Sequence, residues 1–87
     1  MKTFKDISWK QHEVITGAIQ GILVLDNGIE FSIIAGPNTY STPKAPGKSP
    51  SDFVSFEVAV FNEDGIVGDP HGWVDKTEID ILINHHS

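Results

Sequence analysis

Cysteine and arginine are both missing from this chain of 87 residues. Without cysteine there is no disulfide framework, no thiolate nucleophile and no cysteine-ligated zinc site. We therefore expect a reducing compartment, the cytoplasm. Without arginine the bidentate guanidinium contact to guanine is excluded. Because twelve acidic residues stand against six lysines, few cations remain for a nucleic-acid backbone. Direct binding to DNA or RNA is not expected.

Long apolar runs are also missing. Segments such as Ile22 to Leu25 are far shorter than the ~20 residues that cross a bilayer. The opening MKTFKDISWKQHE mixes charged residues with single apolar ones and lacks the apolar stretch of a signal peptide. The chain is expected to be neither membrane-bound nor exported. Its length predicts a single domain over residues 1–87 with a limited core.

Negative charge is concentrated toward the C-terminus. From Glu57 onward the sequence contains seven acidic residues and a single lysine, Lys76. Such a half could imitate a phosphate backbone and occupy a basic groove on another protein, although negative charge also simply keeps a small protein soluble. A host protein with a basic surface is one partner that this distribution suggests.

The strongest secondary-structure pattern is a β-hairpin. Residues 18–25 and 29–35 are rich in branched apolar side chains and flank Asn27-Gly28, a pair that suits a two-residue type I′ turn. Both segments are therefore predicted to be antiparallel neighbours in a sheet.

The two-residue turn also predicts the register of this hairpin. It sets Val24 opposite Phe31 and Leu23 opposite Ser32, which leaves apolar side chains on both faces of the hairpin. A sheet that is apolar on both sides must be covered on both, and one short helix covers only one. We therefore expect a symmetric homo-oligomer in which a second copy covers the other face.

The whole pattern predicts an α+β fold, an antiparallel sheet of four to five strands in a meander with a C-terminal helix packed on one face. The remaining expected elements are a helical turn capped by Thr3 and Asp6, an edge segment over residues 8–14, a half-buried strand over 53–61, a short strand over 66–68, and a helix from Lys76 to about Asn84 capped by Asp75 and Glu78.

A long proline-rich loop is expected over residues 36–52. From Gly36 to Ser51 it holds four of the five prolines and two of the six lysines, with no acidic residue. Loops of this length inside compact domains are either functional or disordered. Tyr40, Lys44 and Lys48 could close over a small nucleotide, the lysines meeting phosphate and the ring stacking on a base. The same composition is also typical of a solvated, semi-rigid loop.

The two tryptophans have different expected roles. Trp73 follows a glycine and precedes the helix, so its indole is expected to pack beneath the helix start. Trp9 lies on a weaker element, and two interpretations stay open for it: a core position, or an exposed edge position that anchors a partner chain.

Catalytic signatures are sparse. Asp69, His71 and Asp75 could supply ligands to a divalent metal, joined by His12 in space, but an Asp-Pro bend and a helix cap explain the two aspartates without a metal. The chain has no Gly-x-Ser-x-Gly elbow, and no carboxylate pair is marked for acid-base work. The expectation is a protein that is not an enzyme and carries no cofactor, with a small metal-assisted hydrolase as the rival hypothesis.

Several motifs occur in combination: an opening MKTFKDI, a DNG hairpin after an apolar strand, a loop with Tyr-Ser, an FEVAVF strand, and Gly-Trp before an acid-capped helix. This layout resembles a group of small phage-encoded accessory proteins, mostly uncharacterised, over nearly the whole chain. The chain departs from that group in its proline-rich loop and at Ile29, where the group tends to carry tyrosine.

The resemblance implies a bacteriophage accessory protein of the anti-defence kind. Such an inhibitor would act in the cytoplasm of the infected host cell by stoichiometric capture of a host defence protein or of a nucleotide signal. A structural or morphogenesis accessory protein is a further alternative.

Overall fold

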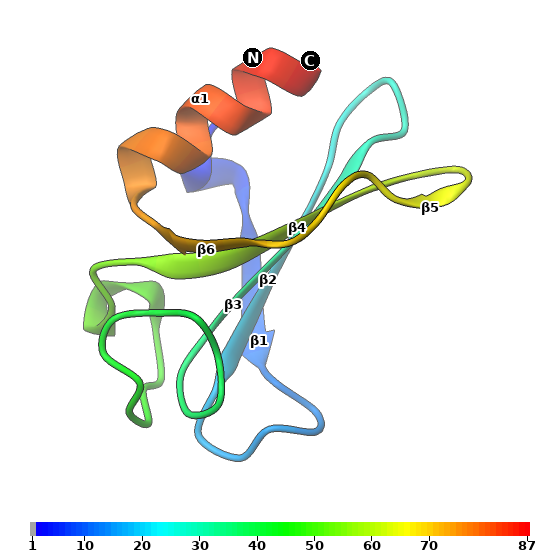
Figure 1. The fold of residues 1–87 in the computed structure, drawn as a ribbon. Coiled ribbons are helices and arrows are strands. Elements are labelled where there is room, and N and C mark those ends of the chain that lie inside the picture. Colours follow the sequence, from blue (N-terminus) through cyan, green and yellow to red (C-terminus); the bar gives the residue numbers. More distant parts are fainter. Residues whose placement is uncertain (1) are drawn as a thin grey trace.

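The computed structural model describes residues 2–87. The elements follow in the order η1 (Phe4–Asp6), β1 (Ser8–Gln11), β2 (Ile19–Val24), β3 (Glu30–Ala35), η2 (Pro50–Asp52), β4 (Phe56–Asn62), β5 (Gly65–Ile66), β6 (His71–Val74) and α1 (Lys76–His86). The strands form one antiparallel sheet in the order β1-β2-β3-β4-β5, and β6 also pairs with β4 (Figure 1). The predicted α+β meander with a C-terminal helix is confirmed, with β6 as an additional strand. No helix in residues 2–87 is long and apolar enough to cross a membrane.

Both predicted helical caps are present. The Asp6 carboxylate accepts the Thr3 N–H at 2.8 Å, which holds the single turn of η1. At the start of α1, Asp75 accepts the Glu78 N–H at 2.8 Å and Glu78 accepts the Asp75 N–H at 3.2 Å. These reciprocal bonds satisfy N–H groups that have no partner inside the helix.

The turn between β2 and β3 has three residues, Asp26-Asn27-Gly28. The Leu25 N–H donates to the Ile29 carbonyl at 2.7 Å, and the Gly28 N–H donates to the Leu25 carbonyl at 3.0 Å. Gly28 has a φ of +89°, as a three-residue hairpin loop with glycine in the left-handed region requires. The predicted two-residue turn is therefore wrong.

The register of the hairpin shifts by one residue as a result. Leu23 lies opposite Phe31, and Ile22 lies opposite Ser32. A shift of one residue moves each cross-strand pair to different partners and changes which side chains share a face. The register separates polar from apolar side chains better than predicted, because Gln20 and Ser32 now share a face and bond through Nε2 and Oγ at 3.1 Å.

The core lies on one face of the sheet, the inner face. Its buried apolar strand residues are Ile19, Leu23, Phe31, Ile33, Ala35, Phe56, Val58, Val60 and Val74. From α1, Ile79 and Ile83 are fully buried against this face, and Figure 1 shows α1 lying over one side of the sheet. Complete burial of each isoleucine stabilises the fold by roughly 1.5–3 kcal/mol.

The opposite side of the sheet, here called the open face, is mixed. Its apolar members are Ile22, Val24, Ile34, Ala59, Phe61 and Ile66, all half-buried or exposed. Polar side chains from Gln20, Glu30, Ser32 and Glu57 lie among them. The hairpin is thus apolar on one face and amphipathic on the other, rather than apolar on both.

The proline-rich loop folds back against the sheet. Thr39 and Ser41 are buried, and their hydroxyls lie 2.7 Å apart. The Thr39 hydroxyl donates to the Gly36 carbonyl at 2.8 Å, and the Thr42 N–H donates to the Ser55 carbonyl at 3.2 Å. Hydrogen bonds within the segment and from Thr42 to Ser55 hold it against the sheet.

Candidate binding site: an exposed aromatic corner

A β-bulge in β6 positions the most exposed aromatic ring of the sheet. Val58 lies opposite His71, and Phe56 lies opposite Val74. Between these two pairs β6 has two residues, Gly72 and Trp73, whereas β4 has only Glu57. The extra residue is Trp73, with a φ of +52°. Bulges bend an edge strand and re-aim a side chain. Trp73 consequently points away from the core, and the predicted packing beneath the helix start is wrong.

Trp73 stacks on Tyr40 of the proline-rich loop. Their ring centroids lie 5.1 Å apart at an interplanar angle of 31°. The Trp73 N–H donates to the Tyr40 carbonyl at 2.8 Å, so the contact is held by the backbone as well. Tyr40 is 53% exposed and Trp73 is 56% exposed. This pair presents two amphipathic rings to solvent, at the edge of the sheet that β6 forms.

One cation and one anion flank the pair. The Lys44 ammonium lies 5.3 Å from the centroid of the Tyr40 ring, a cation–π distance. The Glu57 carboxylate accepts the Tyr40 N–H at 3.0 Å. We call Tyr40, Lys44, Glu57 and Trp73 the aromatic corner. Of the predicted contact residues, the structure brings Tyr40 and Lys44 together here, and it adds Trp73 and Glu57.

Lys48 has a different environment. Its backbone N–H donates to an Asp52 carboxylate oxygen at 2.9 Å, and the Ser49 N–H donates to the same oxygen at 3.2 Å. Both bonds lower the pKa of Asp52 below its ordinary value, and the bond from Lys48 has the larger effect. Lys48 lines a shallow hollow beside Gly17. The structure therefore ties Lys48 to Asp52, while Lys44 lies over Tyr40.

Trp9 faces the inner side of the sheet. Its ring centroid lies 5.8 Å from that of Phe4 and 5.6 Å from that of Phe56. The indole is half-buried and packs against the core. Of the two interpretations of Trp9, the core position is the one that the structure shows.

The candidate metal ligands do not form a cluster in the described residues. In residues 2–87, no three His, Asp or Glu side chains are placed to hold one metal ion. Asp75 caps α1, His71 pairs with Val58 in the sheet, and the His12 Nδ1 accepts two backbone N–H groups in the loop after β1. The structure does not bring Asp69, His71 and Asp75 together as a ligand set.

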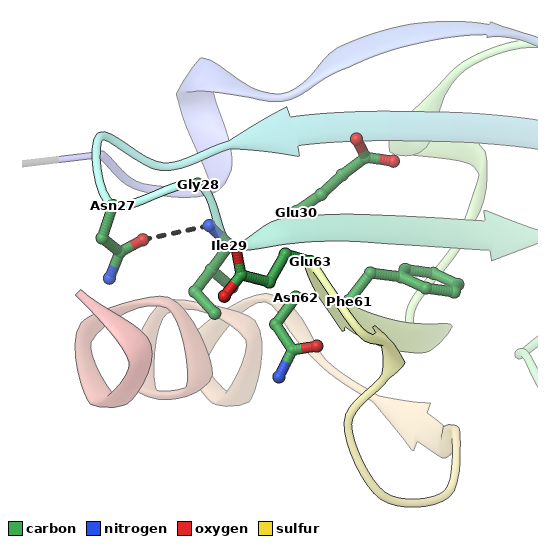
Figure 2. Close-up of a pocket in the computed structure, with 7 residues that line it drawn as sticks. All are labelled: Asn27, Gly28, Ile29, Glu30, Phe61, Asn62 and Glu63. Atoms are coloured by element: carbon green, nitrogen blue, oxygen red, sulfur yellow. Dashed lines mark hydrogen bonds between the residues drawn. The ribbon is translucent and has the colours of Figure 1, made fainter.

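A second hollow lies between the β2–β3 turn and the end of β4 (Figure 2). Its volume is about 460 Å³, and Figure 2 shows Asn27 on one side with Asn62 and Glu63 on the other. The Asn27 Oδ1 accepts the Ile29 N–H at 3.1 Å as part of the turn. None of the seven lining residues is cationic, so the hollow does not suit an anionic ligand.

Comparison of the chain with models of protein families, with curated protein sequences and with solved structures gives no match. The resemblance to small phage accessory proteins therefore stays a prediction.

Proposed function

We propose that this chain is a non-catalytic binding protein whose aromatic corner docks onto a protein partner. The observation that carries the proposal is the backbone of Trp73. A bulky residue in the left-handed region is an outlier, and such backbone costs roughly 1–3 kcal/mol. Because Trp73 is 56% exposed, burial within the chain recovers only part of this cost. Docking of the ring into a partner would explain why the strained position is occupied by tryptophan.

The composition of the corner favours a protein over a nucleotide. Tryptophan and tyrosine are enriched among the few residues that dominate protein–protein binding energy. A nucleotide phosphate would meet only Lys44, with the Glu57 carboxylate nearby. The net charge of −6 would also repel phosphate and attract a partner with a basic rim.

For the biological role, we propose a bacteriophage counter-defence factor that captures a host defence protein stoichiometrically. This assignment rests on the resemblance of the motifs to small phage accessory proteins. The acidic C-terminal half and the exposed aromatic pair support binding to a basic protein surface.

We also propose that two copies associate through the open face. Its six apolar members share one side of the sheet with polar side chains among them, and such a mixture of apolar and polar surface is typical of protein interfaces. Glu57 of the aromatic corner lies opposite Ile34 of the open face. Because Glu57 also lies on the open face, association of two copies would place the aromatic corner beside the interface between them.

Affinity purification from infected bacterial cells tests the proposed function. The wild-type chain is compared with Trp73→Asn and with Val14→Asn, a matched control because Val14 is also exposed, at 84%, and lies in the loop between β1 and β2. We expect a protein that co-purifies in a fixed ratio with the wild type and the control but is lost with Trp73→Asn. Native mass spectrometry that finds a nucleotide in place of a protein would overturn the proposal, as would a partner retained by Trp73→Asn.

A further inference from the structure

A larger hollow lies on the inner side of the sheet, where η1, β1, η2 and the start of α1 meet. Its volume is about 710 Å³, within the ~300–1,000 Å³ typical of small-molecule sites. Trp9 and Phe4 line it, together with Lys5, Lys76 and Asp80. Since Trp9 faces the inner side and Glu57 the open face, the hollow and the aromatic corner lie on opposite sides of the sheet.

Two aromatic rings form one wall of this hollow. Phe4 and Trp9 lie 5.8 Å apart, and both pack on Phe56, at 5.5 Å and 5.6 Å between centroids. Phe56 is completely buried, so it supports the other two from the core side. Both lining rings are half-buried and therefore keep surface for a flat apolar group.

The charge of the hollow differs from that of the whole protein. Lys5 and Lys76 both line it, and the Lys76 ammonium lies 5.4 Å from the centroid of the Phe4 ring. Among the side chains of residues 2–87, Lys10 and Glu13 form the single ion pair within 4.0 Å, so neither Lys5 nor Lys76 has a carboxylate partner there. The Asp80 carboxylate accepts the Phe4 N–H at 2.7 Å. Two cations against one engaged anion leave the hollow positive in a chain of net charge −6.

We propose that this hollow binds a small anionic ligand with a planar aromatic body. The planar part packs on Phe4 and Trp9, and the anionic group lies between the ammonium groups of Lys5 and Lys76. The site is separate from the proposed partner surface, so the chain would bind a small molecule independently of its protein partner.

The indole N–H signals of the two tryptophans provide the test. In a ¹⁵N–¹H correlation spectrum, Trp73→Phe identifies which of the two signals belongs to Trp9. Naphthalene-2-sulfonate is then titrated into the wild-type chain, with 2-naphthol as the uncharged counterpart of similar ring size. We expect the Trp9 signal to move in a saturable way with the sulfonate while the Trp73 signal stays still, and 2-naphthol to bind at least about fivefold more weakly.

Lysine variants separate this site from general dye binding. Lys5→Ala and Lys76→Ala are each expected to weaken sulfonate binding by up to about fivefold, whereas Lys44→Ala, at the aromatic corner, leaves it unchanged. Equal binding of the sulfonate and 2-naphthol would overturn the proposal. So would a Lys5→Ala/Lys76→Ala double variant that binds as tightly as Lys44→Ala. Capture of a protein partner through Trp73 is measured separately, so either proposal can fail alone.

Discussion

The backbone N–H of Trp73 donates to the carbonyl of Tyr40 at 2.8 Å, and the rings of the same two residues stack 5.1 Å apart. The proline-rich loop and the bulged strand β6 thus hold each other at one point. The backbone conformation at Tyr40 and Trp73 decides whether their two rings face solvent together. Single substitutions at or beside these residues can change that conformation.

Replacing Trp73 by asparagine should keep or increase stability. Asparagine enters the left-handed region more readily than a bulky residue, so relief of roughly 1–3 kcal/mol of strain offsets a lost aromatic contact worth about 0.5–1.5 kcal/mol. We expect an unchanged or higher midpoint of thermal unfolding, at about 4–8 °C per kcal/mol. A fall of more than about 4 °C would show that the ring stabilises the fold more than its backbone destabilises it.

Replacing Gly72 by alanine should separate the two rings. A Cβ at this position would come within 2.9 Å of the Tyr40 Cβ, so Tyr40 must shift. We expect a loss of about 1–3 kcal/mol in the free energy of unfolding and a change in the Trp73 indole signal. In a Tyr40→Gly background the blocking atom is gone, so the same alanine should cost measurably less. An equal cost in both backgrounds would contradict the steric explanation.

The helix offers a matched pair of isoleucines. Ile83 is fully buried on the inner face, while Ile81 is 63% exposed. Ile83→Ala should lower the free energy of unfolding by roughly 2–5 kcal/mol, and Ile81→Ala should change it by no more than about 0.5 kcal/mol. Urea denaturation followed by far-UV circular dichroism measures both. Similar losses of stability in the two variants would contradict the assignment of Ile83 to the buried side of α1 and Ile81 to its exposed side.

Acid should weaken the proline-rich loop through Asp52. Its carboxyl pKa is lowered in the folded chain, chiefly because the Lys48 N–H donates to it. The stabilisation is therefore fully present above the ordinary pKa of aspartate and disappears as the pH falls through the lower folded value. NMR titration of the Asp52 carboxyl carbon should show the lowered pKa, and Asp52→Asn should reduce the loss of stability as the pH falls below the ordinary pKa of aspartate. An Asp52 that titrates at its ordinary value would contradict the hydrogen bonds.

Association through the open face predicts a change of mass. We expect light scattering during size-exclusion chromatography to give twice the chain mass of 9.5 kDa at high concentration. Ile34→Asp should return the monomer, because an aspartate opposite Glu57 adds a further negative charge to the open face and lacks a partner in a buried interface. Val54→Asp serves as the control, since Val54 is exposed and lies before β4, outside the open face. A wild-type chain that stays monomeric at high concentration rules the association out.

Most elements could be predicted from the sequence because their patterns are local. The caps at Thr3 and Asp75 and the alternation along β4 each depend on residues a few positions apart. The register of β2 and β3 could not be derived from Asn27-Gly28, since the same pair also fits a three-residue turn that begins at Asp26. One available signal was the separation of polar side chains, because only the observed register places Gln20 and Ser32 on the same face.

The aromatic corner was only partly visible in the sequence. Tyr40 and Lys44 stood out as an aromatic and a cation in an unusual loop. Strand β6 was missed because Asp69-Pro70 and Gly72 indicate a bend, and no local pattern predicts a tryptophan at positive φ. That conformation depends on pairing with β4, a contact between residues distant in the chain.

The bulge at Trp73 also has a consequence for solubility. β6 forms an edge of the sheet, and a straight edge strand offers unpaired N–H and C=O groups on which further chains can assemble. A left-handed residue in the middle of this strand interrupts that row of groups and turns the edge away from a flat ladder. The irregularity that exposes the indole therefore also hinders the growth of fibrils from this side of the molecule.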